Sequence, residues 1–175
     1  MATDLTQDRL AGTWNFVPVH SSAGFAVKYV VGSFRGRFED VYAELVDGQL
    51  KGAANVASIS VKEENLVAHL QAPDFFDLER YPEISFSSGK LDIDGERVEL
   101  DGELTMKGVS RPLHATGTVK GPIEDFAGNT RLGFTLETTV DRTQFGLNWN
   151  MDLPGGGRAL ADEVTLTVEL EFIRG

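Results

Sequence analysis

Hydrophobic and polar residues alternate along most of the chain, and this pattern predicts β-strands. The clearest runs cover residues 23–31, 98–106 and 164–172, where every second side chain is apolar or aromatic. We count about eight such runs, separated by turn signals such as Asp47-Gly48 and Asp94-Gly95. Because most runs have one apolar and one polar face, we expect antiparallel sheet with one face in solvent. Eight strands of this kind can close into a barrel, and a two-sheet sandwich is the alternative.

One stretch departs from the strand pattern. Residues 63–72 begin with acidic side chains, continue with an apolar stripe and stop at Pro73, which predicts a short helix. Phe75 and Phe76 follow in a segment too rich in Asp and Pro to be regular structure. Two large rings in a connection must be buried or leave an exposed apolar patch. They either plug the end of the core or line the mouth of a pocket.

The domain organisation is simple. The length of 175 residues suits one domain with a sizeable core. Residues 1–10 are polar and predict an N-terminal arm, and residues 11–175 predict a single barrel domain. Within it, the alternation slips by one position near residues 39–40, which predicts a bulge. Residues 141–162 contain a triple glycine and predict an irregular loop.

The charge and residue composition of the chain limits the classes of partner that it can bind. The chain has 27 acidic and 16 basic residues, for a net charge of -11. This excess disfavours nucleic acids and anionic membrane surfaces, which would repel the protein. The absence of cysteine excludes disulfides and thiolate chemistry. The start of the chain has no signal-peptide pattern, and no apolar run approaches the roughly 18 residues of a membrane helix. We therefore expect a cytoplasmic protein without stable membrane insertion.

Motifs for catalysis or metal binding are weak. His20, His69 and His114 are far apart and have no metal-ligand spacing, and His114 falls on the solvent phase of its strand. There is no GxSxG elbow, and the triple glycine lacks the Lys-Ser/Thr of a P-loop. We expect no metal, no cofactor and no enzyme activity. The alternative is an enzyme for a lipid-like substrate that uses His20, His69 and Asp74.

An apolar interior is the remaining candidate for a site. The pattern alone leaves open whether its many rings fill a core or surround a cavity. If there is a cavity, the candidate ligand-binding residues are Phe25, Val27, Tyr29, Phe34, Phe38, Phe75, Phe76, Phe86, Leu104, Met106, Phe134 and Trp149. The candidates for a head group are His20, Arg35, Arg37 and His69. Arg35 and Arg37 also fit an alternative role as solvated residues on the outer face of their strand.

Short segments spread over the chain share their order and spacing with a known family. These segments are His20-Ser21, Phe25-Ala26-Val27-Lys28, Gly36-Arg37-Phe38, His69-Leu70, Asp74-Phe75-Phe76-Asp77, Tyr81-Pro82-Glu83-Ile84-Ser85-Phe86, residues 102–112 (GELTMKGVSRP), Phe145-Gly146-Leu147 and Asp162-Glu163-Val164. Together they resemble the YceI-like family of polyisoprenoid-binding proteins over roughly residues 11–173. The sequence departs from that family at Tyr29, where a His is frequent, and at Leu66 and Val67, where an Arg-Asp pair is common. Many members of the family are exported, whereas this sequence shows no signal-peptide pattern.

The resemblance implies an extended lipocalin-like antiparallel barrel with a helix near one end. It also implies that a long isoprenoid or another amphipathic lipid binds inside the barrel, for storage or transport. It supplies no catalytic residues. Two alternatives stay open, an enzyme acting on a lipid-like substrate and a non-binding, stress-related interaction module. A homodimer through the apolar segment 145–153 is a further expectation.

Overall fold

Strands dominate the computed structural model, which describes residues 9–175. In chain order they are β1 (Thr13–Phe16), β2 (Ser22–Tyr29), β3 (Gly32–Phe38), β4 (Val41–Val46), β5 (Gln49–Asn55), β6 (Ile59–Val61), β7 (Glu83–Lys90), β8 (Asp92–Asp94), β9 (Arg97–Met106), β10 (Val109–Glu124), β11 (Thr130–Asp141) and β12 (Leu160–Arg174). Among residues 11–175 there are one α-helix, α2 (Val67–Gln71), and four short 3-10 helices: η1 (Pro18–His20), η2 (Val56–Ser58), η3 (Glu64–Leu66) and η4 (Arg142–Phe145). Arg9 and Leu10 are also helical.

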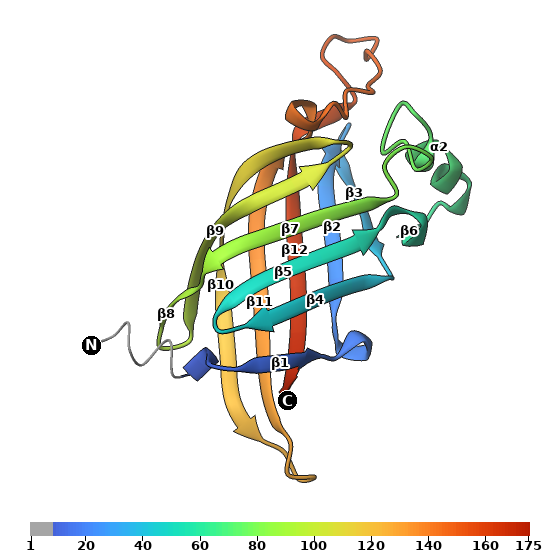
Figure 1. Cartoon of the computed structure of the whole chain (residues 1–175). Helices are drawn as coiled ribbons and strands as arrows, with labels where there is room; N and C mark the ends of the chain where they lie inside the picture. The colour runs from blue at the N-terminus through green and yellow to red at the C-terminus, as the bar shows by residue number, and fades with distance from the viewer. Residues whose placement is uncertain (1–8) are drawn as a thin grey trace.

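Eight strands form a closed cycle of antiparallel pairs. Their order is β1-β4-β5-β7-β9-β10-β11-β12, and β12 pairs with β1 to close the barrel (Figure 1). Strands β1 and β2 both pair with the same edge of β12, one after the other. The C-terminal end of β12, from Phe172, pairs with β1, and residues 160–169 pair with β2. Strands β3 and β6 continue the sheet beyond β2. The predicted eight-stranded antiparallel barrel with one short helix is confirmed.

The predicted bulge near residues 39–40 is a break between two strands. Strand β3 pairs with β2 and β6, whereas β4 pairs with β1 and β5, so the chain changes partners at this point. Backbone hydrogen bonds from Glu39 to Ser58 and from Asn55 to Asp40 hold the break. A loss of phase in the alternation marks both a bulge and a break, and only the partners distinguish them.

A dense core fills one end of the barrel, which we call the closed end. Its fully buried side chains include Leu45, Val98, Val119 and Phe172. The predicted arm over residues 1–10 lies mostly outside the described residues. Of its last two positions, Leu10 is buried in this core, and Arg9 donates hydrogen bonds to carbonyl oxygens at the same end.

Two connections lie across the opposite end, which we call the open end (Figure 1). Residues 62–82 join β6 to β7 and form the helical cover, which contains η3 and α2. Residues 142–159 join β11 to β12 and form the loop cover, which is irregular after η4 as the glycines predict. The helix predicted over residues 63–72 corresponds to Glu64–Leu66 and Val67–Gln71.

Candidate ligand-binding site

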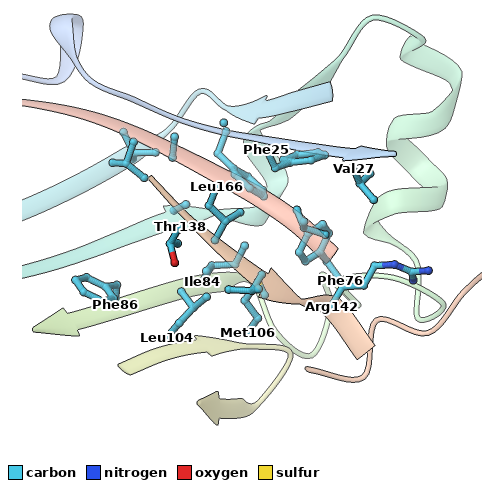
Figure 2. A pocket seen from close by; sticks show the side chains of 18 of the residues that line it. Phe25, Val27, Phe76, Ile84, Phe86, Leu104, Met106, Thr138, Arg142 and Leu166 are labelled. Atoms are coloured by element: carbon cyan, nitrogen blue, oxygen red, sulfur yellow. The ribbon is translucent and has the colours of Figure 1, made fainter. Parts of the chain in front are cut away.

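A cavity of about 460 Å³ occupies the half of the barrel beneath the two covers. Its volume lies in the range of about 300–1,000 Å³ that is typical of ligand pockets. Apolar side chains from strands on all sides of the barrel surround it, including Phe25, Ile84, Leu104 and Leu166 (Figure 2). The barrel interior is therefore filled by side chains at the closed end and hollow in the other half.

Small residues at inward-facing positions create this space. Ala23, Ala43, Gly52, Ala54 and Ala115 all line the cavity, and they come from four different strands. Each stands in an alternating run at a position where a larger apolar residue would fill the interior. The sequence contains this signal, because inward Ala and Gly positions recur in neighbouring strands, but a count of aromatic rings does not reveal it.

The floor of the cavity is the upper surface of the closed-end core. Leu50, Leu100, Leu136 and Leu170 belong to that core and also line the cavity. They are between 2 % and 8 % exposed and present only hydrocarbon. A ligand that enters from the open end therefore meets an apolar surface at full depth, which favours an apolar tail over a polar group there.

Eleven of the twelve predicted ligand-binding residues line the cavity. They are Phe25, Val27, Tyr29, Phe34, Phe38, Phe75, Phe76, Phe86, Leu104, Met106 and Trp149. Phe134 does not line it. Its side chain is 2 % exposed and packs within the closed-end core, with its ring centre 6.0 Å from that of Phe172. Whether the eleven bind a ligand stays a prediction, but they share one cavity.

The predicted head-group residues do not gather at one place. His69 lines the cavity, whereas Arg35 and Arg37 are exposed on the outer face of β3. Arg37 forms an ion pair with Glu39 at 2.7 Å. The solvated role that the alternation allowed for the two arginines therefore fits their positions, because Phe34 and Phe38 occupy the inward phase.

The 3-10 helix η1, which ends at His20, follows β1 at the closed end, whereas α2, which contains His69, lies at the open end (Figure 1). The Nδ1 of His20 is 2.8 Å from a carboxylate oxygen of Glu171, which also pairs with Arg131. The suggested polar group of His20, His69 and Asp74 is therefore wrong, because the barrel places η1 and α2 at opposite ends. Between His69 and Asp74 the nitrogen-to-oxygen distance is 4.0 Å, which is too long for a hydrogen bond.

A cluster of three rings joins the two covers. His69 and Phe75 belong to the helical cover, and Trp149 belongs to the loop cover. The ring centre of His69 lies 5.0 Å from those of both neighbours, with interplanar angles of 81° and 88°. Phe75 and Trp149 are 5.4 Å apart. Edge-to-face contacts of this kind stabilise by about 0.5–1.5 kcal/mol each beyond the burial of area, so His69 holds the mouth of the cavity in shape.

Arg142 is a buried charge at the open end that the motif analysis did not single out. It is 4 % exposed, lines the cavity and points its guanidinium away from the apolar side chains (Figure 2). Its nitrogens donate to four carbonyl oxygens of the loop cover and the start of β12, at 2.5–3.3 Å: those of Leu147, Trp149, Leu160 and Ala161. Burial lowers the pKa of Arg142 from its ordinary value, and the carboxylate of Asp162, 3.9 Å away, acts in the opposite direction.

The alternation does contain a signal for Arg142. Leu136, Thr138 and Val140 take the inward phase of β11, and Arg142 continues that phase just after the strand ends. An inward arginine must find several acceptors, because its five donors are costly to bury unpaired. The carbonyl oxygens of an irregular loop supply them here.

Lys107 links both covers to the barrel wall. It occupies the turn between β9 and β10, and its Nζ donates to the carbonyl oxygens of Pro73 at 2.8 Å and Gly146 at 3.3 Å. Pro73 is part of the helical cover, and Gly146 is part of the loop cover. One exposed ammonium therefore ties together the two segments that lie over the cavity.

The cavity has little polar chemistry of its own. The hydroxyl of Thr138 donates to the carbonyl oxygen of His114 at 2.6 Å. Throughout residues 9–175, every buried side-chain nitrogen and oxygen has a hydrogen-bond partner, and no three potential metal ligands cluster. The same residues contain no helix with the length and hydropathy to cross a membrane. The lining of the cavity is therefore mostly apolar, with His69, Thr138 and Arg142 among its polar side chains.

Known proteins share this architecture. The BcnA protein of Burkholderia cenocepacia superposes with a TM-score of 0.75 at 19 % identity, covering 90 % of this chain and 99 % of that one. A polyisoprenoid-binding domain from Saccharophagus degradans gives a TM-score of 0.70 at 12 % identity, covering 95 % and 99 %. At these identities the likeness establishes the fold alone.

Sequence comparison also finds relatives that match most of the chain. A UPF0312 protein of Staphylococcus aureus is 28 % identical over 172 residues, which cover 91 % of this chain and 96 % of that protein. A UPF0312 protein of Pseudomonas putida is 27 % identical over 164 residues, or 89 % and 82 % of the two chains. The model of the YceI-like domain matches residues 14–172, nearly the whole barrel. The chain therefore belongs to the YceI-like domain family.

Proposed function

We propose that this protein binds a long-chain isoprenoid or a similar amphipathic lipid inside the barrel, and that it stores or carries that lipid. The observation that carries the proposal is the 460 Å³ cavity with a purely hydrocarbon floor. Membership of the YceI-like family supports it. So does the fold that the chain shares with the polyisoprenoid-binding domain from Saccharophagus degradans.

Burial of hydrocarbon supplies enough free energy for such binding. Each buried CH₂ group contributes about 0.8 kcal/mol, so twenty groups contribute roughly 16 kcal/mol before costs. Association costs about 4–15 kcal/mol. A long apolar chain can therefore bind well without a charged anchor, provided that most of it reaches the cavity.

The polar groups at the open end favour a ligand with an uncharged or solvent-exposed head group. The guanidinium of Arg142 already donates to four carbonyl oxygens, so it has little capacity left for an anionic group. Tyr29 and His69 line the cavity at its mouth, and the phenolic oxygen of Tyr29 and the imidazole nitrogens of His69 are polar atoms that a head group could contact. We propose that the apolar tail lies against the floor and that the head group stays between these two side chains.

Native mass spectrometry of freshly purified protein, followed by extraction into organic solvent, tests the proposal. We expect an added mass that disappears on extraction and is recovered as a lipid in the organic phase. Delipidated protein should then take up a long-chain prenyl alcohol at about one molecule per chain. Protein that is purified without any lipid and takes up no prenyl alcohol would contradict the proposal.

Catalysis on a lipid is the second candidate, because the imidazole of His69 lines the cavity. The His69→Phe variant keeps an aromatic ring between Phe75 and Trp149 and removes both nitrogens. We expect both this variant and the unaltered protein to bind lipid and to return it unchanged. A change in lipid mass that occurs with the unaltered protein but not with His69→Phe would favour an enzyme.

A further inference from the structure

The turn between β2 and β3 breaks the usual chemistry of a tight hairpin. Tyr29 pairs with Gly32, so Val30 and Val31 form a two-residue turn. Val30 has a φ of +53°, in the left-handed region that branched side chains avoid. The chain uses Asp47-Gly48 in another tight turn, with a φ of +49° and +80°. Val30 is therefore a point of local backbone strain, and strain of this kind tends to mark a functional position.

Both valines face solvent at the open end of the barrel. Val30 is 54 % exposed and Val31 is fully exposed. Their neighbour Tyr29 is 44 % exposed and lines the cavity. The apolar surface therefore continues from the interior of the cavity over its edge and out to the turn.

The loop cover adds one more apolar side chain to this edge. The backbone N–H of Val30 donates to the carbonyl oxygen of Ala159, and the N–H of Ala159 donates to that of Met151, both at 2.8 Å. Met151, 57 % exposed, therefore lies one backbone segment away from the turn. Beside it, Asp152 and Arg158 form an exposed pair of opposite charges at 3.8 Å. We call Tyr29, Val30, Val31 and Met151 the apolar rim.

We propose that the apolar rim inserts into the surface of an uncharged lipid membrane, where the protein collects or releases the lipid of its cavity. This inference rests on the proposed function. A long-chain lipid resides in membranes and enters water poorly, so its transfer needs an apolar path between bilayer and cavity. The rim supplies that path because it is continuous with the cavity mouth. The net charge of -11 opposes docking on anionic membranes and so favours a zwitterionic surface.

Variants of the rim separate docking from ligand binding. Val30→Asn with Val31→Gly removes both valine side chains and installs a residue pair that suits a tight turn, so we expect folding to be retained. Met151→Ser is a second, independent rim variant. Phe126→Ser is the matched control, because Phe126 is fully exposed at the tip of the β10–β11 hairpin, at the closed end.

Two measurements test the inference. The first is flotation of the delipidated protein with phosphatidylcholine vesicles, and with vesicles that contain phosphatidylglycerol. The second is the rate of uptake of a long-chain prenyl alcohol from phosphatidylcholine vesicles, compared with binding of the same alcohol delivered in ethanol. We expect the double variant to lower vesicle binding and the uptake rate by about tenfold, Met151→Ser to lower both by less, and Phe126→Ser to change neither. Binding from ethanol should be unchanged in all three, and anionic vesicles should bind the unaltered protein more weakly.

The outcomes are distinguishable. Equal vesicle binding and uptake for rim and control variants would overturn the inference. A concentration-dependent dimer that is lost in the rim variants, without any vesicle binding, would also overturn it and would make the rim an interface between copies of this chain. Rim-dependent vesicle binding without uptake of the alcohol from either source would support the docking surface and contradict the proposed function instead.

Discussion

Replacement of Arg142 by Met tests whether one buried guanidinium organises the open end. The substitution keeps the apolar stem and removes all five donors. It removes a donor from four carbonyl oxygens. That of Leu160 keeps the side-chain amide of Asn150, whereas those of Leu147, Trp149 and Ala161 lose the guanidinium. Unpaired buried carbonyls cost about 1–3 kcal/mol each. The loop cover can relieve part of this by moving into solvent, at the cost of the buried contacts of Leu147 and Trp149.

We expect a loss of about 3 kcal/mol in the free energy of unfolding, at the low end of the sum over the three other carbonyls because the loop relaxes. For a chain of this size, that loss lowers Tm by about 6–12 °C. Chemical denaturation measures it. The emission of Trp149 should shift to longer wavelength in the folded variant, whereas Trp14, which is 2 % exposed in the closed-end core, should not respond.

Arg158→Met is the matched control. Arg158 belongs to the same loop cover, but it is exposed and forms its ion pair with the exposed Asp152. We expect a change below about 0.5 kcal/mol. If Arg142→Met and Arg158→Met have the same small effect and leave the tryptophan emission unchanged, the guanidinium does not organise the loop cover, and the reasoning is refuted.

Three further predictions concern the covers, the closed end and the core. Lys107→Met should release a bound lipid several-fold faster in a stopped-flow assay, because both covers lose the donor that they share. Lys51→Met, on the outer face of β5, is the control and should not change the rate. Equal release rates for the two variants would show that Lys107 does not hold the covers in place. The hydrogen bond from Arg131 lowers the pKa of Asp125, so the stabilisation is present above the ordinary carboxyl range and is lost as pH falls through the lowered pKa. Asp125→Asn should therefore be less stable than the unaltered protein at pH 7 and equally stable in strong acid, and parallel pH profiles of Tm would contradict this. Phe172→Ala should lower the free energy of unfolding, measured by urea denaturation, by about 3–5 kcal/mol, because Phe172 is fully buried in the closed-end core. A loss below about 1 kcal/mol would show that the closed end is not tightly packed.

The strands, the helix and the cover with Phe75 and Phe76 were predictable because their signals are local. Alternation assigns each side chain to the inner or the outer face of a strand, and it assigned Phe34, Phe38 and Arg37 correctly. Proline and acidic residues mark the end of the helix and the irregular connection that follows. None of these inferences depends on which strands pair.

Height along the barrel axis was not predictable, because it depends on strand register. Phe86 and Phe134 both face inward, yet Phe86 lines the cavity and Phe134 lies in the closed-end core, where it pairs with Leu170 on β12. The same uncertainty concealed the separation of His20 from His69. An alternating pattern specifies a face, and only the pairing of distant strands specifies the level at which a side chain lies.

The central claim is that the cavity holds the ligand, and a variant that fills the cavity tests it most directly. Ala23 lines the cavity and is paired in the sheet with Phe38 on β3 and Val168 on β12, so Ala23→Phe places a ring in the space for a lipid chain. Thr118→Phe adds a ring on the exposed outer face of β10 and serves as the control. Cavity filling should leave the stability within about 2 kcal/mol of the unaltered protein, which denaturation verifies.

The measurement is a titration of delipidated protein with a long-chain prenyl alcohol, followed through the emission of Trp149 at the cavity mouth. We predict saturable binding of about one molecule per chain for the unaltered protein and for Thr118→Phe. We predict at least about tenfold weaker binding for Ala23→Phe, because the ring displaces several CH₂ groups of the ligand. Equal affinities for Ala23→Phe and Thr118→Phe would place the lipid outside the cavity and contradict the claim.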